Sequence, residues 1–131
     1  MSVAAMAKAS SVPMPYLEQL IGPLRRAGLV TSTRGARGGY QLARDPYDVR
    51  VGEVYRVMEG PVAPMDCVSE DISEQTCPLI EGCETRPVWL EMRDAIVTTL
   101  DSNTLGDLIR QSPRKSARQS VAARKLPTAV G

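Results

Sequence analysis

A turn that contains three glycines joins two short β-type runs, and it constrains the fold of this chain more than any other segment. The first run, residues 29–33, is rich in β-branched side chains, and the second, residues 40–43, alternates between apolar and polar side chains. Glycines permit the positive φ angles that tight hairpin turns need. The sequence therefore predicts a β-hairpin with Arg34 and Arg37 at its tip.

Two helix-forming segments precede this hairpin. Residues 3–9 are rich in alanine, and residues 14–27 repeat apolar side chains at helical spacing. Pro15 suits the first turn of the second helix, Pro23 should bend or end its hydrogen-bond ladder, and Gly28 is a natural stop. Two short helices about four residues apart are typical of a helix-turn-helix, and a hairpin directly after them is typical of a DNA-binding wing.

Charge is segregated along the chain although its formal net charge is only +1. Residues 1–50 contain seven Lys or Arg and three acids, residues 51–111 contain four Arg and twelve acids, and residues 112–131 contain five basic residues and no acid. A basic first section and a basic tail favour a polyanionic partner. The 131 residues suit one domain, and no apolar run approaches the ~20 residues that a membrane span needs, so we expect a cytoplasmic protein without a membrane partner.

The chain contains no histidine. This absence excludes a Ser-His-Asp triad, a Cys-His dyad and a His-ligated metal site built from this chain alone. No phosphate-binding loop is present either, so we do not expect an enzyme.

A long helix with one apolar side is predicted after the hairpin, beginning at Arg86 with Thr85 as its cap. A helix of this length has little core left to cover in so small a chain, so we expect it to pair with a second subunit. Its apolar stripe consists of Val88, Trp89, Met92, Ala95, Ile96, Thr99 and Leu100. Shorter helices are predicted at residues 51–58 and 104–111, the latter with Leu105, Leu108 and Ile109 directed inward.

Three cysteines, Cys67, Cys77 and Cys83, lie in an irregular segment that spans residues 61–83. Their odd number argues against a disulfide framework, and they lack the close pairs of structural zinc sites. Three thiolates completed by a fourth ligand from outside the segment would suit an iron–sulfur cluster, but a thiol redox switch and unliganded cysteines remain open. The surrounding carboxylates should raise the pKa of these thiols, which disfavours an activated nucleophile.

Six stretches of the sequence together resemble the winged-helix iron–sulfur cluster regulators, a family that includes the IscR-type repressors and the nitric-oxide-sensing NsrR-type repressors. They are residues 16–20 (YLEQL), 24–30 (LRRAGLV), 34–43 (RGARGGYQLA), 51–54 (VGEV), 83–89 (CETRPVW) and 104–108 (TLGDL). The match covers residues 2–111 and implies a mainly α fold with a small β-hairpin. We expect a winged helix-turn-helix DNA-binding region at 1–60, a cysteine-containing cluster loop at 61–85, a dimerisation helix and a short final helix at 86–111, and a disordered basic tail at 112–131.

The resemblance implies a homodimeric repressor of transcription that binds a roughly palindromic operator in double-stranded DNA. The second helix would enter the major groove and the wing would touch the minor groove. The residues expected at the DNA are Pro15, Tyr16, Glu18, Gln19, Arg25, Arg34 and Arg37. Cys67, Cys77 and Cys83 would hold a 2Fe–2S or 4Fe–4S cluster that senses cluster status, redox state or nitric oxide. Two alternatives are a metal-free thiol-redox regulator that binds DNA and a truncated subunit that senses nothing.

This sequence departs from the family pattern at three places. Family members begin with a further helix of some two dozen residues, so we expect either a start assigned too late or a truncated form, with Leu20, Leu24 and Trp89 underpacked. Arg86, which stays protonated, occupies the position of the IscR-type histidine ligand. Pro13 replaces a capping Ser or Thr, which costs about 1 kcal/mol of helix stability.

Overall fold

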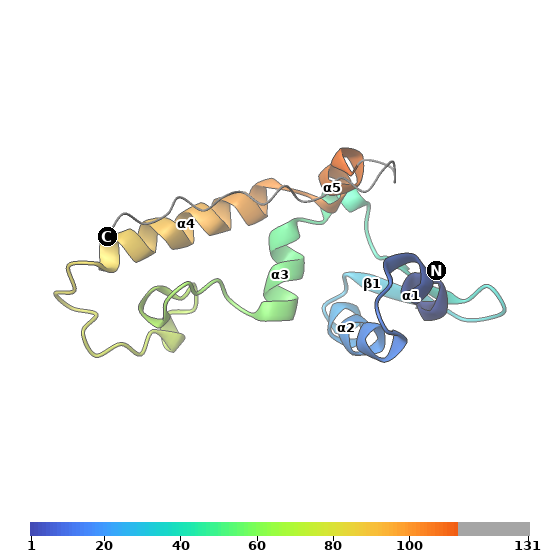
Figure 1. Ribbon diagram of the computed structural model, residues 1–131, viewed down its shortest axis with the longest axis horizontal. Coiled ribbons are helices and arrows are strands. Elements are labelled where there is room, and N and C mark those ends of the chain that lie inside the picture. Colours follow the sequence, from blue (N-terminus) through green and yellow to red (C-terminus); the bar gives the residue numbers. More distant parts are fainter. Residues whose placement is uncertain (113–131) are drawn as a thin grey trace, which may run out of the picture.

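A computed structural model describes residues 1–112, which form five α-helices, one β-hairpin and three short 3-10 turns. The predicted basic tail lies outside the described residues from position 113 on. The described part of the chain is elongated: the first two helices and the hairpin lie at one end, and the segment that carries the cysteines lies at the other (Figure 1). This arrangement confirms the mainly α fold with a small hairpin.

The two helices predicted before the hairpin are both present and pack against each other. Helix α1 (Val3–Ser10) begins after Ser2, whose side chain accepts a hydrogen bond from the Ala5 N–H at 3.2 Å. Helix α2 (Met14–Arg26) begins after Pro13, which provides no side-chain cap, as the sequence predicts.

Helix α2 ends where its sequence signals indicate. Pro23 lies inside the helix, which ends within one turn of it at Arg26. Gly28 then adopts a positive φ of 74°, and the Leu29 N–H donates to the Leu24 carbonyl at 3.0 Å. This pattern is a glycine-terminated helix end of the Schellman type, so the predicted stop at Gly28 is confirmed.

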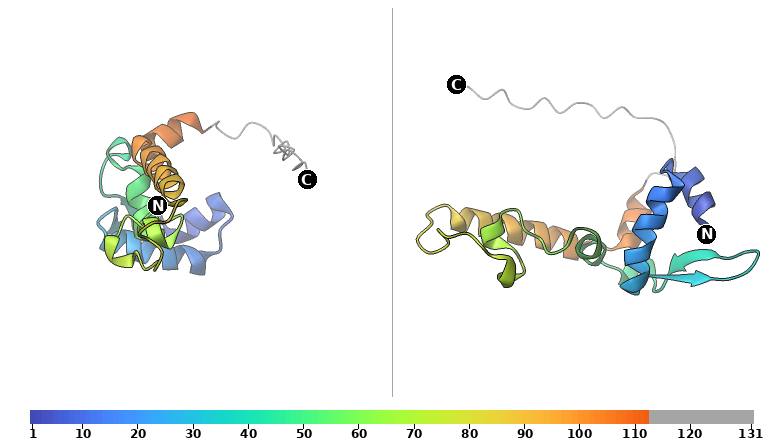
Figure 2. Two further views of the ribbon diagram at one scale, coloured as in Figure 1. Left: turned by 90° about the vertical axis from the view of Figure 1, so that its left-hand side faces the viewer. Right: turned by 90° about the horizontal axis from the view of Figure 1, so that it is seen from below.

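Strands β1 (Val30–Thr33) and β2 (Gly39–Leu42) form an antiparallel hairpin in which Val30 pairs with Leu42. The hairpin projects away from the helices (Figure 2). The backbone of Met1 also pairs with Tyr40, whose N–H donates to the Met1 carbonyl at 2.7 Å. The predicted wing is therefore present next to the helix pair.

The remaining helices are α3 (Val51–Glu59), α4 (Arg86–Ser102) and α5 (Leu105–Gln111), and the turn η1 (Pro46–Asp48) precedes α3. Backbone hydrogen bonds join the segment before α3 to the segment before α5. The Val51 N–H donates to the Asn103 carbonyl and the Leu105 N–H donates to the Val49 carbonyl, both at 2.9 Å. The fully buried side chains Val49, Val62 and Val68 lie in this half of the molecule, outside the helix pair and the wing.

Two details of the predicted helices are wrong. Thr85 makes no side-chain cap on α4, because its hydroxyl lies 3.3 Å from the Cys83 sulfur instead. Leu108 and Ile109 are 45% and 65% exposed, because α5 packs on the rest of the chain through Gly106, which lies against the ring of Tyr47. Within residues 1–112, no helix has both the length and the apolar character that crossing a membrane requires.

Candidate nucleic-acid interface

Helix α2 presents a polar, exposed face at the end of the molecule that carries the wing (Figure 1). The opposite face is apolar, and Ile21 on it is buried. A 3.6-residue period places such polar and apolar positions on opposite sides of a helix. All five predicted DNA-contacting residues of α2 are exposed on its surface: Pro15, Tyr16, Glu18, Gln19 and Arg25.

The wing places the two predicted arginines, Arg34 and Arg37, on its exposed tip. The turn depends on glycine: a Cβ on Gly38 would lie 2.6 Å from the Thr33 carbonyl oxygen, closer than real Cβ atoms approach backbone. Neither arginine forms an ion pair with any of residues 1–112. Both guanidinium groups are thus available to an external anion.

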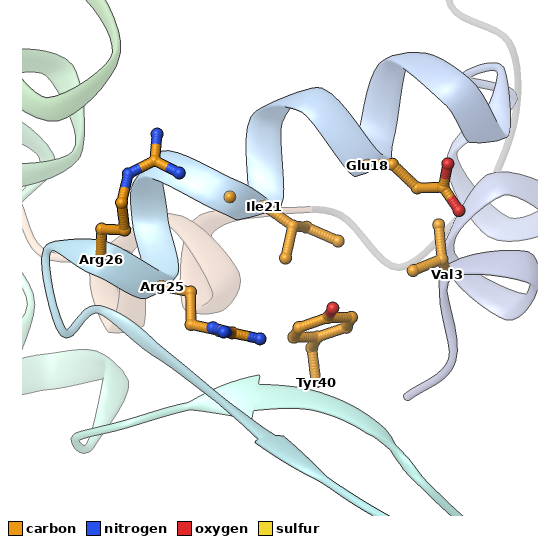
Figure 3. A pocket seen from close by; sticks show the side chains of 7 residues that line it. Val3, Glu18, Ile21, Arg25, Arg26 and Tyr40 are labelled. Atoms are coloured by element: carbon orange, nitrogen blue, oxygen red, sulfur yellow. The ribbon is translucent and has the colours of Figure 1, made fainter.

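A hollow of about 410 Å³ connects the helix face to the wing (Figure 3). Glu18 lies toward one end of the hollow, and the Arg25 guanidinium points toward the ring of Tyr40 on β2 (Figure 3). Tyr40 is not among the residues that the sequence predicts at this interface. Its signal is the two-residue period of β2, because Tyr40 and Leu42 are half-buried while Gln41 between them is exposed.

A second, apolar hollow of about 350 Å³ lies where α1, α2 and the hairpin meet. Leu20 and Leu24 line it and are half-buried, as is Trp89 on α4. The full lining is Met6, Leu17, Leu20, Ile21, Leu24, Val30, Tyr40, Gln41 and Leu42.

The predicted apolar stripe of α4 is largely exposed rather than packed on the chain itself. Val88 is 57% exposed, and a shallow apolar hollow of about 330 Å³ runs along the next turns of the helix. This hollow is lined by Met92, Ala95, Ile96, Thr99 and Leu100.

The three cysteines carry free thiols and lie in different surroundings. Cys67 is in the turn η2 (Asp66–Val68) and is 8% exposed, whereas Cys77 and Cys83 are half-buried farther along the segment. No three His, Cys, Asp or Glu residues of positions 1–112 are grouped so that they could hold a metal ion. An iron–sulfur cluster needs its protein ligands around one centre, so this arrangement of the cysteines does not fit one.

Arg86 binds the backbone of this segment. Its Nε donates to the Cys67 carbonyl at 3.3 Å, and its Nη2 lies 3.5 Å from the Gln75 side-chain oxygen. The side chain at the position of the IscR-type histidine thus holds the cysteine-bearing turn against α4.

Hydrogen bonds around Cys83 lower the pKa of its thiol below the ordinary value. The first cause is the hydroxyl of Thr85, followed by the backbone of Thr85, with smaller effects from Arg86. The prediction that nearby carboxylates raise the thiol pKa values is therefore wrong at Cys83. Two of those carboxylates are engaged elsewhere: Glu70 binds Arg56, and Glu74 lies 3.3 Å from the Ser69 hydroxyl.

These features define the class of the protein: a winged-helix protein whose α2 and wing present an exposed surface at one end of the molecule. The family model for Rrf2, described as iron-dependent transcriptional regulator, matches residues 1–111. The chain belongs to this Rrf2 family of transcriptional regulators.

Individual relatives agree with this assignment. The chain is 43% identical over 107 residues to the HTH-type transcriptional regulator CymR of Bacillus subtilis, which covers 82% of this chain and 70% of CymR. It resembles the solved structure of B. subtilis CymR, described as the global cysteine regulator, with a TM-score of 0.71 and 38% identity over 86% of this chain and 80% of that one.

Two further solved structures are similar. T. potens IscR has a TM-score of 0.68 and 38% identity, covering 92% of this chain and 76% of that one. The oxidised form of Staphylococcus aureus CymR has a TM-score of 0.63 and 36% identity, covering 86% and 79%. The relatives are transcriptional regulators, so the winged-helix fold and the prediction of a chain that is not an enzyme are confirmed.

Proposed function

We propose that this protein represses transcription by binding, as a homodimer, to a roughly palindromic operator in double-stranded DNA. The observation that carries the proposal is the shared location of the exposed α2 face and the two wing arginines at one end of the molecule. A major groove admits an α-helix, and arginines on a hairpin tip suit the adjacent phosphates or minor groove.

The side chains of α2 suit base recognition. Glu18 can accept a hydrogen bond from a cytosine amino group, and Gln19 can pair with adenine. Pro15 and Tyr16 lie one turn earlier on the same exposed surface, and Arg25 supplies positive charge toward the wing. Specificity would thus come from α2, and salt-dependent affinity from the arginines.

Each section of the chain has its own part in the proposal. Residues 1–60 bind DNA, residues 61–85 receive the signal, and residues 86–111 pair two copies through the apolar stripe of α4. The exposed hollow along that stripe supports the pairing, because a second copy of the same helix could bury it.

We propose that the signal acts at Cys67, Cys77 and Cys83, which would ligate a 2Fe–2S or 4Fe–4S cluster only if the segment that carries them rearranged to bring the three thiols together. The similarity to IscR and the iron-dependent description of the family support this form of sensing.

A metal-free thiol switch is the second candidate for the signal. One specific observation favours it: Cys67 is buried while Cys77 and Cys83 are half-buried, and the three thiols do not form a group that could hold a metal ion in the described residues. The similarity to a CymR solved in an oxidised form points the same way.

Duplex selection from a random library on the purified full chain tests DNA binding. We expect enrichment of sequences with two related half-sites and binding that weakens steeply with salt. A library that stays random after repeated rounds would contradict the proposal.

Iron and acid-labile sulfide analysis with a visible absorption spectrum, on anaerobically purified protein, separates the two forms of sensing. A cluster gives visible absorption with iron and sulfide in matching amounts. Colourless protein whose affinity for the selected duplex changes after treatment with the thiol oxidant diamide would establish the thiol switch instead.

A further inference from the structure

Arg56 on α3 joins three segments that are far apart in the sequence. Its Nε and Nη2 lie 3.0 and 2.8 Å from the two carboxylate oxygens of Glu70, which follows the first cysteine. Its Nη1 and Nη2 lie 2.8 and 3.1 Å from the two oxygens of Asp101 near the end of α4. One guanidinium therefore makes two-pronged contacts with both carboxylates, the strongest geometry for such pairs.

Glu70 also closes the turn that contains Cys67. The Val62 N–H donates to the Glu70 carboxylate at 2.8 Å, and the Glu70 N–H donates to the Val62 carbonyl at 3.0 Å. We call residues 62–70 the cysteine turn. Cys67 is buried within it beside the fully buried Val68, so a reagent reaches this thiol only when the turn opens.

Helix α4 holds the cysteine turn from the other side. Arg86 donates to the Cys67 carbonyl, and Arg93 Nη1 donates to the Val68 carbonyl, both at 3.3 Å. The closed turn is thus bound by two arginines of α4 through its backbone, and by Arg56 of α3 through the Glu70 side chain.

The same side of α3 is attached to the wing. Glu53, one helical turn before Arg56, lies 2.6 Å from Arg44, which follows β2 by two residues. Arg44 also donates to the Asp48 carbonyl at 3.1 Å. Helix α3 therefore carries one ion pair to the cysteine turn and another to the base of the wing.

We propose that Arg56 is a positioning residue that couples the cysteine turn to the DNA-binding region. When the cysteine turn opens at Cys67, Glu70 separates from Arg56. Helix α3 then shifts, and the position in which it holds the wing changes with it. Coupling between two sites is reciprocal. DNA that fixes the position of the wing must therefore also change how often the cysteine turn opens. The inference rests on the proposed DNA-binding function.

The test measures alkylation of Cys67 by iodoacetamide in the full-length protein, resolved by peptide mass spectrometry. The free protein is compared with protein saturated by the duplex selected above. In the wild type we expect DNA to change the Cys67 labelling rate about fivefold or more, the low end of ordinary coupling between sites. In Glu70→Gln and in Arg56→Lys, we expect DNA to leave the rate unchanged.

Two matched variants separate coupling from simple loss of structure. Asp101→Asn removes the α4 contact of Arg56 but leaves the contact with Glu70, and Glu91→Gln removes an exposed carboxylate of α4 that contacts neither arginine. Both should keep the response of Cys67 to DNA. Circular dichroism melting checks that every variant is folded at the labelling temperature.

Four results would overturn the inference. A full DNA response in folded Glu70→Gln would show that the pair carries no coupling, and an equal loss in Asp101→Asn would show a structural role only. A wild-type protein that binds the duplex with an unchanged Cys67 rate would refute the coupling alone. A wild-type protein that selects no duplex would instead refute the proposed function, and the inference with it.

Discussion

At the scale of one residue, Gly52 on α3 leaves the space in which Arg56 contacts both Glu70 and Asp101. We call these three side chains the Arg56 junction. A Cβ at this position would overlap the Asp101 carboxylate and the Arg56 guanidinium. Gly22 on α2 is the contrasting case, since its Cβ would meet only the end of the Arg26 side chain, at 3.4 Å. Both glycines lie inside helices, where alanine is the better helix former.

We expect Gly22→Ala to raise the free energy of unfolding by about 0.5–1 kcal/mol, because alanine loses less backbone entropy in a helix. Gly52→Ala should instead lower it by about 1 kcal/mol, because overlap with the ion pair outweighs this gain. Urea unfolding followed by circular dichroism measures both values. A stabilised Gly52→Ala would show that the junction can move aside freely.

Arg37 at the wing tip has a predictable effect on DNA binding. Arg37→Ala should weaken binding to all duplexes and reduce the slope of log affinity against log salt by about one unit, since one phosphate contact is lost. Fluorescence anisotropy over a salt titration measures the slope. Arg110→Ala, which removes an exposed arginine from α5, is the control and should leave the slope unchanged. An unaltered slope in Arg37→Ala would contradict the wing assignment.

Among the secondary-structure elements, those with local signals could be predicted from the sequence. The apolar period of residues 14–27, the stop at Gly28 and the glycine turn of the hairpin each act over a few residues, and the structure contains all three elements. The exposed DNA-facing side of α2 follows from the same period. Tyr40 was missed because its place in the site depends on how the hairpin packs against α2.

Contacts between distant segments could not be predicted. Arg56 contacts Glu70 and Asp101, which lie 14 and 45 positions away in the sequence, and no periodicity of the sequence predicts such contacts. The apolar side of α5 was predicted to face inward, but a pattern cannot show whether such a face meets its own chain. Cysteine spacing likewise does not determine the distances between thiols, because the irregular segment between them has no fixed rise per residue.

The apolar side of α4 gives a prediction about assembly. Ile96→Glu should convert a dimer to a monomer, because a carboxylate in the hollow cannot be buried against a second copy without losing its hydration. Thr98→Glu, on an exposed position of the same helix outside the hollow, is the control and should remain dimeric. Sedimentation velocity measures the outcome. A dimeric Ile96→Glu variant would show that α4 is not the interface.

At the scale of the whole molecule, the Arg56 junction makes stability depend on pH. The Arg56 guanidinium lowers the pKa of Glu70 below its ordinary 4.5 and that of Asp101 below its ordinary 3.8. Carboxylates with lowered pKa values stabilise the folded state above their ordinary values, and this contribution is lost as the pH falls through the lowered values.

The difference in unfolding free energy between the wild type and a Glu70→Gln/Asp101→Asn variant should therefore be largest above pH 4.5 and shrink as the pH falls through the lowered pKa values of the two carboxylates. Urea unfolding at a series of pH values measures the difference. Glu91→Gln is the control, since an exposed carboxylate contributes little at any pH. A difference that stays constant with pH would mean that the junction does not stabilise the fold through charge.

The backbone pairing between residues 49–51 and 103–105 has a consequence for the order in which the chain acquires its structure during translation. Helices α1 and α2 and the hairpin contact one another over short sequence distances, so they can assemble soon after they leave the ribosome. The segment before α3 must wait for a partner made more than fifty residues later. A nascent chain would thus carry a formed wing before α3 is anchored, and a stalled ribosome would display that wing without its sensor.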